Sequence, residues 1–309
     1  MPLHPQAAAL IASAAGGKPV EEMTIEEGRA ALEERVRLMG GSPQEVATVR
    51  DLSAGSVPVR VYAPSADQPL PALVFFHGGG WVKGSLQSHD VVCRAIANGA
   101  GCVVVSVDYR LAPEHQFPAA IDDAFASLQY VAAHAAELGI DPDRLAVAGD
   151  SAGGNLAAGV ALLARDRGGP RLVHQLLIYP VTDHNLDTAS YLANADGFML
   201  TREAMRFYWR HYLRSDADGD DPRASPLRAS RFDGLPSALI ITAEFDPLRD
   251  EGRAYASRLE AAGVPVTYSE YAGLVHGFVT YMDVIDQGKV AISEASAALR
   301  AAFASPVAV

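Results

Sequence analysis

Residues 149–153 read Gly-Asp-Ser-Ala-Gly, and they lie between an apolar run at 145–148 and a helical pattern at 151–165. A serine on a sharp strand-to-helix turn is the setting of a nucleophile elbow, where the hydroxyl projects from the carboxyl end of a sheet. Gly149 and Gly153 allow this turn to close without Cβ clashes. The helix start behind it supplies backbone N–H groups and the positive end of a dipole. The pattern therefore predicts that Ser151 is a nucleophile.

A nucleophilic serine needs a general base, and the base needs an acid that orients it. In folds with this turn the acid and then the histidine follow the serine along the chain. Asp246 follows the apolar run 238–243, and His276 is the only histidine beyond it. Both are expected on loops at the carboxyl ends of strands, where the sites of α/β proteins form. We therefore predict a triad of Ser151, Asp246 and His276.

Other residues could take the part of the acid. Glu244 lies two residues before Asp246, and Asp183 follows the apolar run 173–179. Both stay open as alternatives at this point. Asp250 is expected one turn into the next helix, where a capping or ion-pair role is favoured. A single histidine such as His276 is by default a hydrogen-bonded structural residue, and only its two partners make the catalytic interpretation stronger.

The stretch 75–84, FFHGGGWVKG, ends an apolar strand with three consecutive glycines. Glycine costs about 0.5–1 kcal/mol relative to alanine within regular structure, so the chain must gain a special turn or a close backbone approach. A phosphate loop is excluded because no lysine follows the second glycine of the 79–85 pattern. We instead expect this backbone, together with the N–H of Ala152, to donate to a developing oxyanion. His77 is expected to brace the loop through a hydrogen bond.

The composition narrows the class of partner. The 309 residues carry a formal net charge of -12, which argues against nucleic acid or an anionic membrane as the main partner. No apolar run approaches the roughly 18–20 residues that span a bilayer, and no Lys or Arg precedes the short apolar stretch near the start, so we expect a cytoplasmic protein. Two cysteines, Cys93 and Cys102, are expected as free thiols. No Cys/His cluster indicates a metal, and we expect no cofactor.

Apolar runs alternate with helical patterns from residue 72 onward, which predicts an α/β fold with a mostly parallel sheet covered by helices. Two consecutive runs before residue 72 predict an antiparallel start. Residues 184–230 interrupt the alternation with an extra helix at 201–213, as an insertion over the sheet would. The eight strand candidates are 46–52, 57–63, 72–76, 103–107, 145–148, 173–179, 238–243 and 266–271. The helix candidates are 20–39, 88–98, 118–136, 151–165, 201–213, 249–262 and 289–303.

Five motifs together resemble the hormone-sensitive-lipase-like (family IV) bacterial esterases: HGGGW (77–81), YRLAPEHQFPAA (109–120), GDSAGGNLA (149–157), DPLRDEG (246–252) and HGF (276–278). The resemblance implies an α/β-hydrolase fold that occupies 1–309 as a single domain, with a helical cap formed by about 1–45 and 184–230.

By motif position, the resemblance implies the triad Ser151, Asp246 and His276 and an oxyanion hole of Gly79, Gly80 and Ala152. Gly78 is not expected to donate directly. In the YRLAPE stretch, Tyr109, Arg110 and Glu114 are expected to be structural.

The expected activity is hydrolysis of short- to medium-chain acyl esters by a serine carboxylesterase. The same apparatus could act on amides or lactones. A non-catalytic ligand receptor on this scaffold is disfavoured because His276 is present. An acyl pocket between cap and sheet is expected from Trp81, Phe198, Met199, Phe207, Tyr208 and Trp209, with ordinary packing as the equal alternative for each. The resemblance also implies a homodimer through a sheet edge, for which 266–271 is the candidate.

Overall fold

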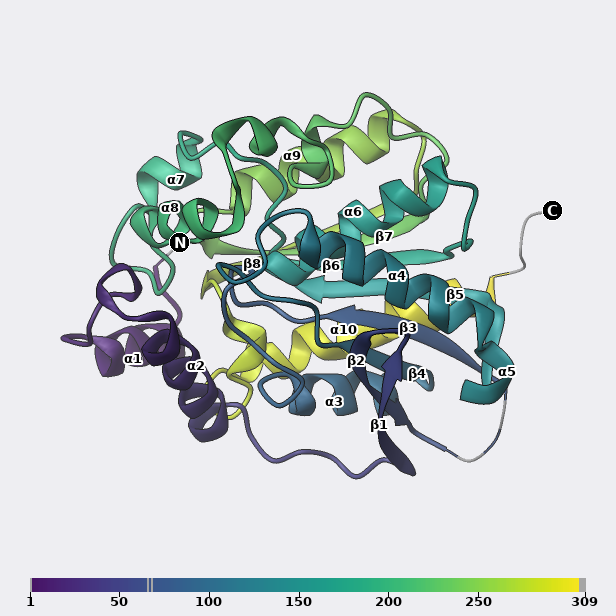
Figure 1. Ribbon diagram of the computed structural model, residues 1–309. Coiled ribbons are helices and arrows are strands. Elements are labelled where there is room, and N and C mark those ends of the chain that lie inside the picture. Colours follow the sequence, from purple (N-terminus) through teal and green to yellow (C-terminus); the bar gives the residue numbers. More distant parts are fainter. Residues whose placement is uncertain (1, 66, 68, 306–309) are drawn as a thin grey trace.

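The computed structural model describes residues 2–65, 67 and 69–305, which are built around an eight-stranded sheet (Figure 1). The strands are β1 (Thr48–Ala54), β2 (Val57–Ala63), β3 (Leu70–Phe76), β4 (Val103–Val107), β5 (Ile140–Asp150), β6 (His174–Ile178), β7 (Ser237–Phe245) and β8 (Val266–Val275). They lie in the order β1-β2-β4-β3-β5-β6-β7-β8. The pairs β1–β2 and β2–β4 are antiparallel and the other neighbours are parallel, which confirms the predicted sheet and its antiparallel start.

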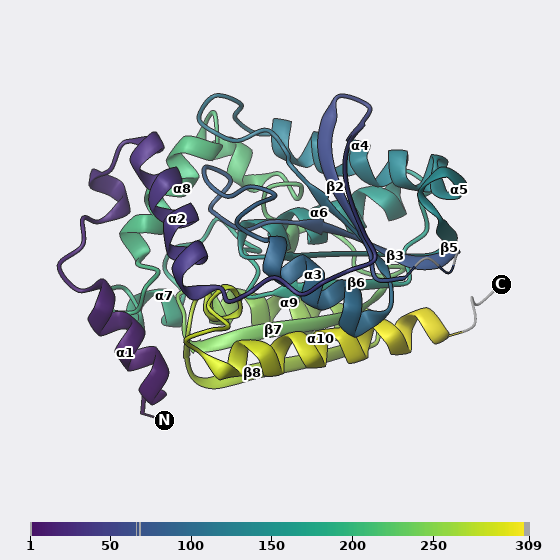
Figure 2. The same cartoon turned by 90° about the horizontal axis from the view of Figure 1, so that it is seen from below.

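Helices cover both faces of this sheet. Besides short 3₁₀ turns, they are α1 (Pro5–Ala14), α2 (Ile25–Met39), α3 (Asp90–Ala100), α4 (Ala119–Ala133), α5 (Ala135–Leu138), α6 (Ala152–Asp166), α7 (Ala189–Ala193), α8 (Arg202–Tyr212), α9 (Arg249–Ala261) and α10 (Asp286–Ala304). In both views α3 and α10 lie on one face, and α4, α6 and α9 on the other (Figures 1 and 2). Two apolar cores result, one on each side of the sheet.

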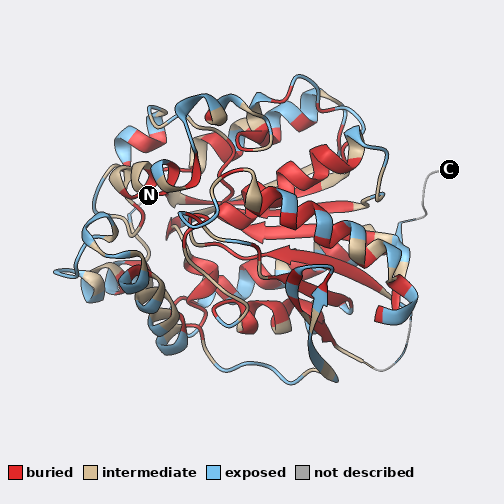
Figure 3. Cartoon of the chain, in the orientation of Figure 1, coloured by how far each residue is buried: buried red, intermediate tan, exposed pale blue. Residues whose placement is uncertain are grey.

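The central strands are apolar on both faces, as two helical layers require. β4 reads VVVSV and is buried at every position, and β3 is buried from Pro71 to Phe76. Burial decreases toward the two outer strands, β1 and β8, in which most residues are exposed or intermediate (Figure 3). The apolar runs that predicted strands are therefore those that the helical layers cover.

Four helices, α1, α2, α7 and α8, gather beyond one end of the sheet (Figure 1). The N-terminus of α2 is closed by a capping box, in which the Thr24 hydroxyl accepts from the Glu27 N–H at 3.1 Å and the Glu27 carboxylate accepts from the Thr24 N–H at 2.9 Å. In α8, the Thr201 hydroxyl accepts from the Ala204 N–H at 3.0 Å. Helices were expected over both regions, whereas α1 and α7 were not anticipated.

One arginine ties α2 to the rest of the chain. The Arg29 guanidinium donates to both Glu114 carboxylate oxygens at 2.8 and 2.7 Å, and also to the carbonyls of Val82 and Ala112 at 2.9 and 3.2 Å. Glu114 thus has a structural contact, as the sequence predicted. Arg110, in the same motif, likewise donates two hydrogen bonds to one carboxylate, that of the buried Asp123 on α4, at 2.8 and 2.7 Å.

Three further predictions from the sequence concern the two cysteines, membrane-spanning helices and the sheet edge of the expected dimer. Cys93 and Cys102 are both free and buried. Among the described residues, no helix has the length and apolar character needed to cross a bilayer. β8 forms one edge of the sheet, as the proposed dimer requires, and the dimer itself stays a prediction.

A buried histidine at the start of β6 makes the stability of the fold sensitive to acid. The His174 Nδ1 lies 2.8 Å from the Ser237 hydroxyl, which itself donates to the Val173 carbonyl, so Nδ1 carries the proton. Nε2 is buried and has no hydrogen-bond partner in the described part of the chain. Burial lowers the pKa of His174 to about 4.

We therefore predict that the free energy of unfolding falls as the pH is lowered through the interval between about 6.5, where an unfolded histidine titrates, and about 4. In this interval the unfolded chain binds a proton at His174 that the folded chain does not, which removes about 1.4 kcal/mol per pH unit. Urea unfolding of wild type and His174→Gln across this range should show a shallower dependence in the variant. Exposed His115→Gln is the control, and equal slopes for wild type and His174→Gln would contradict the prediction.

Candidate active site

The serine turn between β5 and α6 has the geometry that its glycines were expected to permit. Ser151 has φ 55° and ψ -119°, a conformation rare for a residue with a side chain. Its N–H donates to the Ile178 carbonyl at 2.8 Å. A Cβ on Gly149 would lie 2.2 Å from the Gly153 carbonyl carbon, and a Cβ on Gly153 would lie 1.9 Å from the Phe76 carbonyl oxygen. Only glycine can therefore occupy these two positions.

Three loops bring Ser151, His276 and Asp246 into one hydrogen-bonded chain. The His276 Nε2 lies 2.9 Å from the Ser151 Oγ, and the Nδ1 lies 2.7 Å from an Asp246 carboxylate oxygen. Asp246 directly follows β7 and is fully buried, while His276 directly follows β8 and its side chain is 12% exposed. The other Asp246 carboxylate oxygen accepts from the Leu248 N–H at 2.9 Å, which holds the carboxylate in place. The ring of Tyr179 flanks the imidazole at 4.6 Å between centroids.

The carboxylates of the alternative acids interact with groups other than His276. Glu244 accepts from the Gly273 N–H at 2.7 Å, and Asp183 forms an ion pair with Arg228 at 2.5 Å. Asp250, in the first turn of α9, accepts from the Ser190 N–H at 2.8 Å. In this structure the carboxylate that contacts the His276 imidazole is that of Asp246.

The first glycine of the 77–80 loop is held by the residue before the serine. The Gly78 N–H donates to the Asp150 carboxylate at 2.8 Å, so it is not free for another acceptor. The same carboxylate lies 3.0 Å from the His89 imidazole. Burial acts to raise the pKa of Asp150, but the attraction of His89 and the Gly78 N–H outweigh it, and the pKa is lowered. The neighbouring His77 is buried and stacked on Tyr109 at 4.3 Å, and its Nδ1 donates to the Gly78 carbonyl at 2.9 Å.

The next two glycines meet different neighbours. Gly79 has φ 124°, and a Cβ there would lie 2.3 Å from the Lys83 carbonyl oxygen. Gly80 has φ 64°, and its Cβ would lie 2.4 Å from the ring of Tyr208 on α8. Within the described residues, the N–H groups of Gly79, Gly80 and Ala152 make no internal hydrogen bond. They are therefore available to a group that enters beside Ser151.

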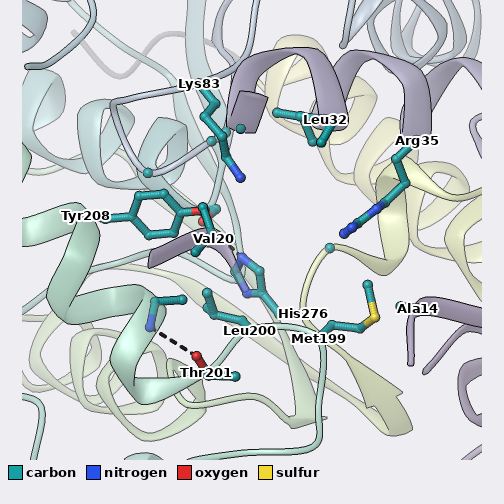
Figure 4. A pocket seen from close by; sticks show the side chains of 18 of the residues that line it. Ala14, Val20, Leu32, Arg35, Lys83, Met199, Leu200, Thr201, Tyr208 and His276 are labelled. Carbon is teal, nitrogen blue, oxygen red and sulfur yellow. Dashed lines mark hydrogen bonds between the residues drawn. The ribbon is translucent and has the colours of Figure 1, made fainter. Parts of the chain in front are cut away.

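A cavity of about 570 Å³ opens over Ser151 and His276 (Figure 4). Gly79 and Gly80 line it, together with residues from the N-terminal segment 11–36 and from 196–208. Of the expected acyl-pocket residues, Phe198, Met199 and Tyr208 line this cavity. No described group of three or more His, Cys, Asp or Glu side chains is arranged to hold a metal ion.

Three residues expected in the pocket do not line it, and this corrects the sequence-based assignment. Trp81 and Trp209 are buried and pack against one another at 4.6 Å, and Trp81 also stacks on Tyr212 at 4.3 Å. Phe207 packs on the His211 ring at 4.2 Å. The Trp81 contacts join α8 to the glycine loop, whereas Phe207 and His211 both lie on α8. The role of these residues is packing, which the sequence had left as the alternative.

The sequence did not identify several lining residues, among them Val20, Arg35 and Lys83. Leu32 and Val36 of the predicted helix 20–39 also line the cavity. A charged residue on that same helix carries no local signal that it points into a cavity. Only the docking of α2 against the loops that follow β3 and β4 reveals it.

Comparison with known proteins places these features in a family. The family described as alpha/beta hydrolase fold matches residues 73–280. The chain is 47% identical over 269 residues to the carboxylic ester hydrolase LipN of Mycobacterium tuberculosis, with 84% of this chain and 72% of that protein covered. It is 39% identical over 315 residues to an ethyl acetate hydrolase of Pseudomonas putida, with 96% and 98% covered. The crystal structure of a thermostable esterase from Pseudomonas putida ECU1011 superposes with a TM-score of 0.94 at 39% identity, covering 99% of each chain.

The glycine loop and α8 offer a test of their contact. We predict that Gly80→Ala lowers both stability and ester hydrolysis, because the new methyl group must displace the Tyr208 ring. Gly101→Ala is the matched control, since Gly101 has the same φ of 64° and no atom within 4 Å of its Cβ position. Left-handed backbone alone costs about 1–2 kcal/mol for an alanine, so the control should lose no more than this.

Urea unfolding measures the stability of both variants. Gly80→Ala should lose more stability than Gly101→Ala, and Tyr208→Ala in the Gly80→Ala background should recover part of the difference. Equal losses in the two single variants would show that the Tyr208 ring does not constrain position 80.

Proposed function

The chain belongs to the α/β-hydrolase family and is a carboxylesterase, and we propose that it cleaves short- to medium-chain acyl esters through a Ser151–His276–Asp246 triad. The resemblance to esterases that the sequence motifs indicated is thereby confirmed at the level of family and enzyme class. The observation that carries the proposed mechanism is the hydrogen-bonded chain from the Ser151 Oγ through the His276 imidazole to the buried Asp246 carboxylate.

In the proposed first half-reaction, the His276 Nε2 accepts the Ser151 proton as the Oγ attacks the ester carbonyl. Asp246 keeps the proton on Nδ1 and stabilises the imidazolium that forms. The imidazolium then gives its proton to the departing alcohol, and an acyl-enzyme remains on Ser151. In the second half, His276 activates a water that releases the acid and restores the serine.

The N–H groups of Gly79, Gly80 and Ala152 are the proposed oxyanion hole. Among the described residues these N–H groups have no partner. Gly79 and Gly80 border the cavity beside the serine, and the Ala152 N–H lies at the N-terminus of α6, where the helix dipole favours negative charge. Removing one such donor typically costs about a hundred- to a thousandfold in turnover. Gly78 is left out of the hole because its N–H already donates to Asp150.

We propose that 1–309 act as a single domain in which about 1–45 and 184–230 form a cap over the site. Residues from both segments line the cavity, and the Arg29 contacts fix α2 against the loops that follow β3 and β4. A cavity of about 570 Å³ lies within the range of small-molecule sites and suits a short or medium acyl chain. The ethyl acetate hydrolase among the relatives acts on an ester of this size.

The first functional prediction concerns the nucleophile and the size of the substrate. We expect wild type to hydrolyse p-nitrophenyl acetate, butyrate and octanoate faster than palmitate, in keeping with the proposed preference for short- to medium-chain esters. Ser151→Ala should lose nearly all of this activity, down to the residual acceleration that binding and an oxyanion hole provide. The matched control is Ser305→Ala, at the exposed end of α10. Activity retained in Ser151→Ala would overturn the assignment of the nucleophile.

The second functional prediction separates the candidate acids. Asp246→Asn should lower kcat by about 10⁴-fold, because the amide favours the wrong imidazole tautomer while leaving the geometry intact. Glu244→Gln and Asp183→Asn remove charge near the same loops and should stay close to wild type. Steady-state kinetics with p-nitrophenyl butyrate measure all three variants. A large loss in Glu244→Gln or Asp183→Asn, with Asp246→Asn active, would reassign the acid.

A further inference from the structure

Two cations that have no carboxylate partner among the described residues line the cavity over Ser151. Lys83 belongs to the loop after β3, and Arg35 belongs to α2. Both side chains are half-buried, and Figure 4 shows their nitrogens directed into the cavity from two sides, with His276 between and below them. They come from segments far apart in the sequence, and the fold brings both to the lining of one cavity.

The position of Arg35 on α2 explains why it has no ion-pair partner in the part of the chain that the structure describes. The residues three and four positions away on either side are Ala31, Leu32, Leu38 and Met39, none of which is charged. Its neighbour Glu34 is engaged with Arg37 at 2.7 Å. No described carboxylate lies within ion-pair distance of the Arg35 guanidinium.

Packing holds Lys83 in place, since no carboxylate in residues 2–65, 67 and 69–305 forms an ion pair with it. Its side chain passes Gly28 of α2, where a Cβ would lie 3.4 Å from the Lys83 Cδ, and its ammonium lies 5.3 Å from the centre of the Tyr208 ring. The same ring covers Gly80. The Lys83 ammonium is therefore positioned next to the proposed oxyanion hole, where a cation–π contact leaves its charge available to an anion.

The carboxylates around the cavity do not neutralise these two cations. Asp150 is engaged with Gly78 and His89, and Glu21 and Asp196 are exposed. The third lining cation, Lys18, is paired with Glu27 at 2.8 Å. The formal net charge of the chain is -12, and these two cations, unpaired among the described residues, stand out against this acidic composition.

We propose that the preferred substrates are esters that carry a carboxylate away from the scissile bond, such as half-esters of dicarboxylic acids, and that Lys83 and Arg35 bind this carboxylate. The proposal rests on the proposed ester hydrolysis at Ser151. A partly desolvated guanidinium gains most from a carboxylate, which it holds with two parallel hydrogen bonds, and a nearby ammonium adds a point charge. A neutral ester of the same shape leaves both cations without this partner.

The test compares isosteric esters that differ only in charge. On the acyl side, ethyl hydrogen adipate is paired with ethyl 6-methylheptanoate, in which an isopropyl group replaces the carboxylate. On the alcohol side, 5-acetoxypentanoate is paired with 5-methylhexyl acetate. Hydrolysis is followed by pH-stat at low ionic strength in wild type, Lys83→Met, Arg35→Gln and the double variant. Arg37→Gln is the control, since it removes one exposed charge from the same helix without lining the cavity.

The measured quantity is the ratio of kcat/KM for the charged ester to that for its neutral partner. For at least one pair, this ratio should fall by about ten- to a hundredfold when Lys83 or Arg35 is neutralised, and further in the double variant. The Arg37→Gln ratio should equal that of wild type. Raising the salt concentration should reduce the ratio in wild type more than in the double variant.

The outcomes distinguish this inference from the function on which it rests. Hydrolysis of both members of each pair, with ratios unchanged by the variants, would overturn the carboxylate site and leave the esterase mechanism intact. A wild type that is folded and hydrolyses none of the four esters or the p-nitrophenyl esters would overturn the proposed function itself. A fall in the ratio that Arg37→Gln reproduces would show a net-charge effect and also overturn the site.

Discussion

The close approach of the first turn of α6 to the end of β3 is the constraint on which the site depends. The Cβ position at Gly153 lies 1.9 Å from the Phe76 carbonyl oxygen, so the helix can begin there only without a side chain. This approach forces Ser151 into its positive-φ conformation and projects the hydroxyl beyond the strand ends. Because the glycine loop also leaves from β3, the same contact places the loop amides beside the serine.

The elbow and the loop are further coupled through one side chain. Asp150 precedes the serine, and its carboxylate accepts from the Gly78 N–H while lying against His89. This accounts for why three glycines follow His77: each approaches a different neighbour, first Asp150, then the backbone of Lys83, then the Tyr208 ring. Ordering three glycines costs conformational entropy, and the close contacts at these positions offset it by fixing the direction of the Gly79 and Gly80 N–H groups.

The sheet and the groups at its strand ends could be predicted because they depend on local signals. Each predicted apolar run matches one strand, and the loops after β5, β7 and β8 follow from chain order alone. α1 escaped prediction because its alanine-rich stretch has no clear polar face, and α7 because it is only five residues long. Trp81 and Trp209 were assigned to the pocket because residue type cannot distinguish an aromatic that lines a cavity from one that packs behind it.

The reacting groups could be predicted from the sequence and the cavity wall could not, because different interactions hold them in place. The reacting groups sit at strand ends, whose relative positions are set by hydrogen-bonded register within the sheet. The cavity wall comes from α2 and α8, whose placement depends on a few tertiary contacts such as the Arg29–Glu114 fork and the packing of Trp81 on Tyr212. A helix docked in this way can change its inward side chains without disturbing the register of the sheet. Substrate choice can therefore vary on the wall while the chemistry below it stays constant.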